Sequence, residues 1–172
     1  DYLVRYQNAA YARRYQELVE QVQSAEAPLH STQFAEAVAR SYFKVLAYKD
    51  EYEVARLYAE SVFLDKVKEE FEGDYSLRFH LAPPLLAKPD PHTGEIRKRS
   101  FGPWMMVLFR GLAKFKFLRG TAWDLFGGTA ERRAERQDIV DFEAMIDQLL
   151  PKLGRDNHAL AVELAGLPVR IR

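Results

Sequence analysis

Apolar residues recur at intervals of three and four over most of this chain, which predicts amphipathic α-helices. Asp50 and Thr129 stand just before two of these stretches. Both are suitable N-caps, because their side-chain oxygens can accept hydrogen bonds from the first backbone N–H groups of a helix. The helical spacing covers residues 2–24, 33–47, 50–71, 103–118, 129–150 and 158–164.

A period of two replaces the helical spacing in the middle of the chain. Leu77, Phe79 and Leu81 are apolar and alternate with polar residues, which is the pattern of a half-buried strand. A loop rich in proline and turn formers, residues 88–94, separates this strand from a return strand predicted at 96–101. The two strands are therefore expected to form a hairpin.

These patterns predict a fold that is mainly α with a small antiparallel β-element (α+β), in which a helical bundle packs on a two- or three-stranded hairpin. Residues 169–172 also alternate, like the start of a strand, and Trp123, Leu125 and Phe126 are expected to lie back on the core. With 172 residues, 48% of them hydrophobic, the chain has enough material for one packed domain spanning residues 1–172.

Composition narrows the possible chemistry. The chain has no cysteine, which excludes disulfides, thiolate catalysis and an iron–sulfur cluster held by this chain alone. Acidic and basic residues balance at 25 each, so any electrostatic recognition must be local. No apolar run reaches the roughly 20 residues of a membrane span, and the opening residues lack the basic and apolar regions of a signal peptide. The absence of cysteine fits the expected cytoplasmic location. The missing initiator methionine suggests a processed chain or a fragment of a longer protein.

The clearest local signal is a basic segment, because residues 96–122 contain no acid. It predicts either a docking face for an acidic partner, a phosphate-bearing ligand or an anionic lipid, or a solvated face that acids elsewhere compensate. Residues 104–118 fit a core helix with a few exposed cations, or an interfacial membrane helix. The seven cations of the segment are Arg97, Lys98, Arg99, Arg110, Lys114, Lys116 and Arg119.

No catalytic set is evident in the sequence. His80 and Arg78 share the polar face of the first predicted strand, where His80 would be either a structural histidine or a contact to a ligand or active site. The histidines lack metal-ligand spacing, no serine stands in a GxSxG motif, and Gly127-Gly128-Thr129 resembles a phosphate-binding loop only superficially. Aromatic and basic residues do not interleave as an RNA-binding sheet requires, so neither a metal nor a nucleic-acid partner is expected.

Several segments in order resemble the C-terminal region of the large fused indolepyruvate ferredoxin oxidoreductases of bacteria, a 2-oxoacid:ferredoxin oxidoreductase family. The resemblance spans nearly the whole chain and is specific as a series, although no single piece is a catalytic motif. The segments are Asp50-Glu-Tyr-Glu-Val-Ala-Arg-Leu-Tyr58, Phe71-Glu-Gly-Asp-Tyr75, Phe79-His-Leu-Ala-Pro-Pro-Leu-Leu86, Lys98-Arg-Ser-Phe-Gly-Pro-Trp104, Leu118-Arg-Gly-Thr121, Asp124-Leu-Phe-Gly127, Glu131-Arg-Arg-Ala-Glu-Arg136 and Val169-Arg-Ile-Arg172.

The resemblance implies a piece of an enzyme that decarboxylates arylpyruvates oxidatively to acyl-CoA and passes electrons to ferredoxin. Its thiamine diphosphate and iron–sulfur clusters are expected upstream in the parent protein, because this chain has no cysteine and no Gly-Asp-Gly segment. The chain is then an accessory domain, inactive alone, whose partners are the rest of the parent enzyme and an acidic ferredoxin. It either docks a partner through residues 96–119, caps or dimerises the enzyme, or lends His80 and Arg78 to a neighbouring active site. An independent helical module that binds an acidic partner is the alternative.

Overall fold

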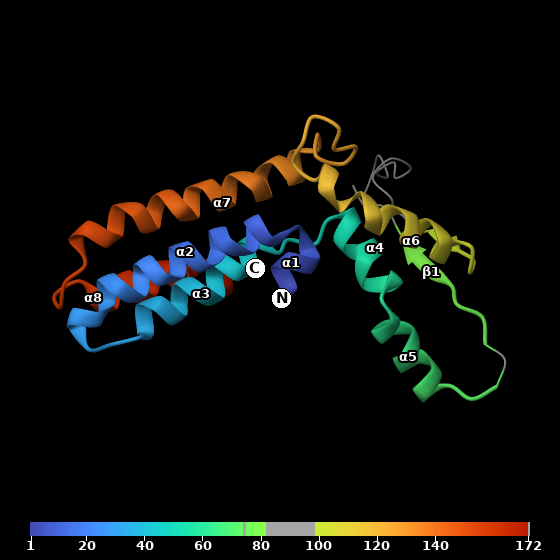
Figure 1. Cartoon of the computed structure of the whole chain (residues 1–172), viewed down its shortest axis with the longest axis horizontal. Coiled ribbons are helices and arrows are strands. Elements are labelled where there is room, and N and C mark those ends of the chain that lie inside the picture. Colours follow the sequence, from blue (N-terminus) through green and yellow to red (C-terminus); the bar gives the residue numbers. More distant parts are fainter. Residues whose placement is uncertain (74, 82–98, 172) are drawn as a thin grey trace, which may run out of the picture. The chain divides into compact units, whose positions relative to one another are not determined.

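The computed structural model describes residues 1–73, 75–81 and 99–171. It confirms a mainly α-helical chain with a small antiparallel sheet (Figure 1). The predicted loop at 88–94 and the start of the predicted return strand lie outside the described residues. The elements are α1 (Tyr2–Tyr6), α2 (Ala9–Glu26), η1 (Ala27–Leu29), α3 (Gln33–Leu46), α4 (Glu51–Ala59), α5 (Ser61–Glu70), β1 (Phe79–Leu81), β2 (Arg99–Phe101), α6 (Met105–Lys114), η2 (Phe115–Leu118), α7 (Ala130–Leu149), η3 (Leu150–Lys152) and α8 (His158–Ile171).

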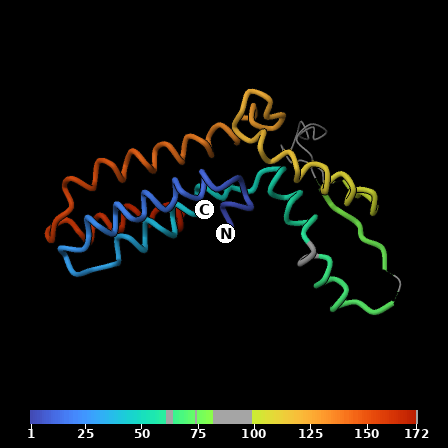
Figure 2. The backbone as a smooth tube through the Cα atoms, viewed as in Figure 1, coloured from blue at the N-terminus to red at the C-terminus, as the bar shows by residue number. Residues whose placement is uncertain are grey.

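The chain divides into two compact units. Unit 1 combines residues 1–48 with residues 127–172, and unit 2 consists of residues 49–126. In sequence, unit 2 is therefore an insertion between α3 and α7 of unit 1, as the colour order of the backbone shows (Figure 2). That the whole chain acts as one domain stays a prediction.

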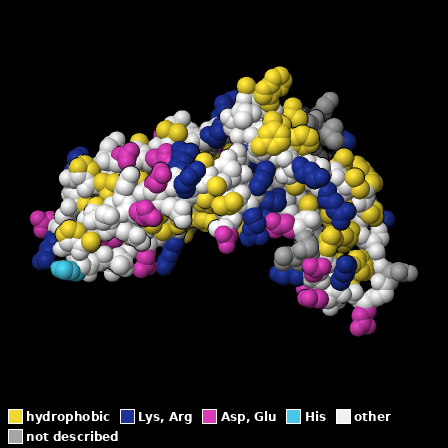
Figure 3. All heavy atoms as spheres, viewed as in Figure 1, with side chains coloured by type: hydrophobic (Ala, Val, Ile, Leu, Met, Phe, Trp, Pro, Cys, Tyr) yellow, Lys and Arg dark blue, Asp and Glu magenta, His cyan; other side chains and the backbone are white. Residues whose placement is uncertain are grey.

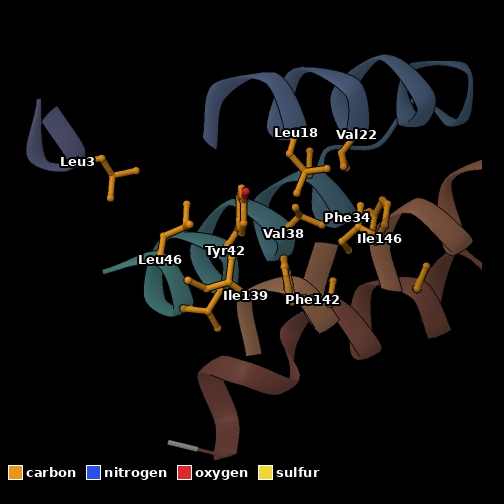
Figure 4. Packing of buried hydrophobic residues seen from close by; sticks show 14 of the residues in the cluster. Leu3, Leu18, Val22, Phe34, Val38, Tyr42, Leu46, Ile139, Phe142 and Ile146 are labelled. Carbon is orange, nitrogen blue, oxygen red and sulfur yellow. The ribbon is translucent and has the colours of Figure 1, made fainter. Parts of the chain in front are cut away.

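Unit 1 is a helical assembly around an apolar core. Most of its buried side chains come from α2, α3, α7 and α8, and Leu3 of α1 and Tyr48 belong to the same core (Figure 4). Aromatic rings form a stack through this core: Tyr42 lies 5.8 Å from Tyr15 and 5.7 Å from Phe142, ring centre to ring centre, with nearly parallel planes. Stacked rings contribute beyond the area that they bury, so Tyr42 joins three helices of the unit.

Two helices predicted as continuous are interrupted by local capping. Residues 2–24 were expected to be one helix, but the Asn8 side chain accepts from the backbone N–H of Tyr11 at 2.8 Å and begins α2 as its N-cap. Residues 50–71 divide at Glu60, whose backbone is extended and separates α4 from α5. The predicted N-caps Asp50 and Thr129 are confirmed, since each side chain accepts a backbone N–H of its own helix.

The end of the chain is helical where a strand was predicted. α8 continues through Pro168 to Ile171, so the expected helix end at residue 164 and the expected strand start at 169 are wrong. The Lys44 ammonium donates to the carbonyl oxygen of Val169 at 3.3 Å, which satisfies one of the acceptors that a helix C-terminus leaves without an intrahelical partner. Alternation over the four residues 169–172 was too short a signal to exclude a helix.

Unit 2 packs its hairpin against two helices. β1 and β2 are antiparallel, with Phe79 opposite Phe101 and His80 opposite Ser100. Phe79 is buried and meets the rings of Tyr58 from α4 and Phe109 from α6 edge to face, at 5.4 and 5.3 Å. The other buried apolar side chains of this core are Ala55, Met105 and Met106. Across the part of the chain that the structure describes, no helix is long and apolar enough to cross a membrane.

Candidate functional site

The strand residues singled out in the sequence lie on the open side of the hairpin. Arg78 and His80 are both exposed, and His80 stands opposite Ser100 in the sheet register. No hydrogen bond or ion pair joins the His80 ring to another of the described residues. The described residues therefore supply no carboxylate to orient this imidazole as a general base, and a role in catalysis would need a group from outside them.

The predicted basic segment does not form one continuous docking surface. Arg99, Arg110 and Lys114 are exposed, and Lys116 is half-buried. Arg97 and Lys98 lie outside the described residues. The prediction that Arg119 belongs to an exposed docking face is wrong, because its side chain is only 4% exposed and forms an ion pair with Asp50.

Asp50 and Arg119 form the centre of a buried charged cluster in unit 2. The Asp50 carboxylate caps α4 by accepting from the N–H of Glu53 at 2.8 Å, and also accepts from both Nε and Nη2 of Arg119, the latter at 2.8 Å. The Arg119 guanidinium lies over the Tyr52 ring, 5.8 Å from its centre. One carboxylate thus ties the start of α4 to the residue that follows η2, 69 positions later.

A second buried pair lies along α4 itself. Glu53 is fully buried, and both of its oxygens accept from Arg56, at 2.8 and 2.6 Å. Arg56 also donates to Glu60, one turn further on. The hydrogen bonds from Arg56 to Glu53 outweigh the desolvation of the guanidinium and raise its pKa further above its ordinary value. Arg56 is therefore a permanently charged, structurally committed group.

Two more titratable side chains flank the cluster. Burial and the nearby Asp124 carboxylate, which accepts from the Tyr52 hydroxyl at 3.3 Å, raise the pKa of Tyr52 to about 12. Burial, together with the positive charges of Arg56 and Arg119, lowers the pKa of Lys116 below its usual range. Lysines with lowered pKa values occur in active sites, but structural ion-pair networks produce the same shift.

This charged cluster has a structural role and does not form a ligand-binding site. Its three cations, Arg56, Lys116 and Arg119, face the carboxylates of Asp50, Glu53 and Glu60, so no surplus of either charge is left for an anion or a metal. A group of three potential metal-ligating side chains does not occur among the described residues. The cluster holds η2 and the loop after it against α4.

The open face of α6 is the most unusual surface in unit 2. Trp104, Val107 and Leu108 are 56, 69 and 54% exposed, although the opposite side of the same helix is buried. Exposed apolar side chains also occur in η2 and in the loop after it, where Trp123 and Leu125 are 79 and 72% exposed, so the expectation that these two lie on the core is wrong. We call this surface the aromatic–basic face; its residues are Trp104, Val107, Leu108, Arg110, Gly111, Lys114, Phe115, Phe117, Trp123 and Leu125.

Hydrophobic and basic side chains lie next to one another over unit 2 in the space-filling view (Figure 3). A large exposed patch of this kind is uncommon on a soluble monomer and marks a surface that contacts a partner or a lipid. Aromatic side chains and arginine are also the residues enriched at the centres of protein interfaces. The aromatic–basic face is thus the strongest candidate functional site in the described part of the chain.

Unit 1 contains a buried polar junction where three elements meet. The Glu26 carboxylate accepts from the backbone N–H groups of Phe34 and Ala35, at 2.9 and 2.8 Å, and lies 2.6 Å from Nε2 of His158. Burial opposes ionisation of Glu26, but the hydrogen bonds from His158, Phe34 and Ala35 outweigh it and lower the pKa of the carboxyl. Glu26 therefore caps α3 and fastens the start of α8.

A shallow hollow of about 460 Å³ opens beside this junction and is lined by His30, Ser31, Thr32 and Gln33. Helix N-termini can bind anions through their backbone N–H groups. Here Glu26 already occupies two of those donors on α3, so the hollow has no comparable group to offer to a ligand.

A second polar junction in unit 1 joins α2, α3 and α7. The Arg14 guanidinium donates to both oxygens of Glu143, each at 2.6 Å, and the Tyr42 hydroxyl donates to the same carboxylate. Burial and the Glu143 charge raise the pKa of Tyr42 above its ordinary value. Since α2, α3 and α7 meet at Glu143, this junction is also structural.

Comparison with known proteins gives one match. A family model described as a family of unknown function, DUF6537, matches residues 1–172. The chain belongs to this family. No curated protein and no solved structure matches it. The family's description names no activity, so the function must be argued from the residues of this member.

An iron–sulfur cluster does not fit the residues of this chain. An iron–sulfur cluster is held by cysteine thiolates, and the chain contains none. The buried carboxylates of both units are committed to arginine, histidine or backbone N–H donors. No step of a redox reaction can be assigned to the described side chains.

Sequence reasoning missed the charged cluster, although part of its signal was visible. Glu53, Arg56 and Glu60 have the spacing of helical ion pairs, but the same spacing is common on exposed faces. The pairing of Asp50 with Arg119 joins distant positions and had no local signal. The stripe on α6 could have been found, because Trp104, Val107, Leu108, Gly111 and Phe115 recur at helical spacing on the side away from Phe109.

Proposed function

We propose that this chain is an accessory, non-catalytic interaction domain of a larger oxidoreductase of the indolepyruvate ferredoxin type. The ordered series of segments described above supports the parent enzyme. The commitment of the buried charges to structural pairs supports an accessory role, because no described nucleophile, base and orienting group are assembled together. Catalysis, thiamine diphosphate and the iron–sulfur clusters belong to the rest of the parent in this proposal.

The observation that carries the proposal is the aromatic–basic face of unit 2. Burying an exposed aromatic or aliphatic side chain of this size contributes about 1.5–3 kcal/mol, so leaving several in water is costly unless a partner covers them. In a parent enzyme such a face would contact either the neighbouring domains or the electron acceptor. Contact with the neighbouring domains would give the domain a role in assembly, and contact with the electron acceptor would give it a role in docking.

Truncation of the parent enzyme tests the proposal. The enzyme that ends before residue 1 of this chain is compared with the intact enzyme in two assays of indolepyruvate oxidation, one with ferredoxin and one with a small artificial dye as electron acceptor. Sedimentation of both proteins reports on assembly, including homo-oligomers. Loss of ferredoxin reduction with dye reduction spared assigns the domain to docking, and loss of both rates together with assembly assigns it to structure.

Two results would contradict the proposal. If truncation leaves assembly and both rates unchanged, the domain is not an accessory part of this reaction. If both rates fall in a well-assembled enzyme, the domain contributes to the active site. His80 and Arg78, which are exposed on the hairpin, would then be the residues to change first.

A second candidate function is an independent interaction module that binds an acidic partner. It is favoured by the exposed cations Arg110 and Lys114, which border the apolar stripe of α6. An independent module would bind such a partner in full without the catalytic domains. The two candidates therefore differ in whether indolepyruvate-dependent electron transfer changes when the chain is removed.

A further inference from the structure

α6 has two apolar sides, only one of which is covered by the described residues. Met105, Met106 and Phe109 are buried in the core of unit 2. Trp104, Val107, Leu108, Gly111 and Phe115 are spaced by three, one, three and four residues, which aligns them on the other side of the helix. A helix that is apolar all round is normally buried all round, so its open side has a partner outside these residues.

Gly111 leaves a notch in the middle of this stripe. A Cβ atom added at Gly111 would meet no atom of a described residue within 4 Å, apart from its chain neighbours and the backbone of its own helix. Glycine inside a helix costs about 1 kcal/mol relative to alanine, and its usual reason is a close approach of another backbone or side chain. No described residue makes that approach, so among these residues the notch is open to a projecting side chain of a partner.

The cations border the stripe along one edge. Arg110 and Lys114 are four residues apart on α6, so they lie one above the other next to Val107. The sequence from Arg99 to Trp123 contains no acid. Charge complementarity therefore requires carboxylates along one side of whatever covers the stripe, because like charges there would be repelled.

We propose that the aromatic–basic face binds an acidic protein, which places an apolar side chain in the Gly111 notch and carboxylates against Arg110 and Lys114. The choice of an acidic electron carrier as this partner depends on the function proposed above. A protein is favoured over an anionic membrane because a notch rewards a shaped occupant, whereas lipid rewards a continuous apolar surface with cations on both borders.

Substitution of Gly111 tests the notch. The full-length protein that carries this chain is prepared as Gly111→Met and, as a matched control, as Gly166→Met, since Gly166 lies in α8 and also has open space at its Cβ position. Both changes favour the helix, so neither should unfold the protein. Affinity is measured by interferometry for a bacterial ferredoxin and, separately, for vesicles of phosphatidylcholine and phosphatidylglycerol at three to one.

We expect Gly111→Met to weaken ferredoxin binding about tenfold or more, because an occupied notch overpacks the centre of the interface, and Gly166→Met to change it less than about twofold. The double variant Arg110→Glu and Lys114→Glu should also bind ferredoxin more weakly, and its affinity should depend less on salt concentration. Arg13→Glu with Arg155→Glu, two exposed cations of unit 1, is the control for net charge.

Three outcomes would overturn the proposal: no binding of ferredoxin, binding that is equal in the Gly111 and Gly166 variants, or vesicle binding that Gly111→Met strengthens. The last would identify a lipid surface. Failure of this inference is distinguishable from failure of the proposed function. If ferredoxin binding depends on the notch but the parent protein does not oxidise indolepyruvate, the docking surface stands and the proposed oxidoreductase is wrong. If truncation abolishes ferredoxin reduction but Gly111→Met has no effect, the proposed function stands and the docking surface is wrong.

Discussion

In the part of the chain that the structure describes, unit 1 buries more of its large apolar side chains than it leaves exposed, whereas unit 2 leaves more of them exposed than it buries. Among the described residues, fifteen buried side chains form the apolar core of unit 1 and five form that of unit 2. Unit 2 adds the charged cluster of Asp50, Glu53, Arg56 and Arg119, all of them buried. Buried ion pairs are weak contributors to net stability, because desolvation offsets most of the Coulomb attraction.

The difference indicates that unit 2, rather than unit 1, has a surface suited to a partner. Unit 1 uses charges such as Glu26 and Glu143 at the edges of a large core, where they fasten helix ends. Unit 2 uses charges beside a small core and leaves Trp104, Phe117 and Trp123 more than half exposed. A unit stabilised mainly by apolar packing and a unit stabilised partly by ion pairs should respond differently to substitution.

Phe142→Ala should have the largest effect. The ring is stacked on Tyr42 inside the core of unit 1, and its removal leaves a cavity that the packed helices cannot fill. We expect the free energy of unfolding to fall by about 4 kcal/mol. Urea denaturation measures it, with Val140→Ala, an exposed position of the same helix, as the control. Equal effects of the two substitutions would contradict a core that depends on this ring.

Arg119→Met should lower the free energy of unfolding by about 3 kcal/mol, because it leaves the Asp50 carboxylate buried without its cation. Hydrogen exchange should rise in α4 and α6 of unit 2 more than in α7 of unit 1. Arg110→Met is the control, since Arg110 is exposed on α6. If Arg119→Met were as harmless as Arg110→Met, the charged cluster would not hold unit 2 together.

Glu26→Gln should cost about 2 kcal/mol at neutral pH, because an amide accepts more weakly than the carboxylate from His158 and the start of α3. The pKa of Glu26 is lowered in the folded protein, so its contribution is complete above the unfolded pKa of about 4.3 and disappears as the pH falls through the folded value. Acid titration of the urea midpoint measures this.

The variant Glu26→Gln should therefore lose less stability than the natural chain between pH 7 and pH 3. Glu20→Gln, an exposed glutamate on the same helix, should leave the acid limb unchanged. Parallel acid limbs for the natural chain and Glu26→Gln would show that the junction of α2, α3 and α8 is not held by a charged carboxylate.

The sequence predicted what depends on local pattern. Helical periodicity located α3 and α7 nearly to the residue, and Asp50 and Thr129 were identified as caps because capping involves neighbours only. The sequence could not show that Arg119 is buried and Lys114 exposed, because the burial of Arg119 depends on Asp50, which lies far away in sequence. Pro168 inside α8 could not be foreseen either, since tertiary contacts with α3 override a poor helix former.

The double substitution Val107→Ser and Leu108→Ser should have the smallest effect on stability. It tests directly whether unit 2 leaves the open side of α6 uncovered. Both side chains are more than half exposed, so the free energy of unfolding should change by less than about 0.5 kcal/mol. The control is Met106→Ser on the buried side of the same helix, which should destabilise unit 2. Binding of an apolar fluorescent dye to the native protein should fall in the exposed double variant. If that variant were as destabilised as Met106→Ser, the open side of α6 would be covered by the chain itself, and unit 2 would need no partner to complete it.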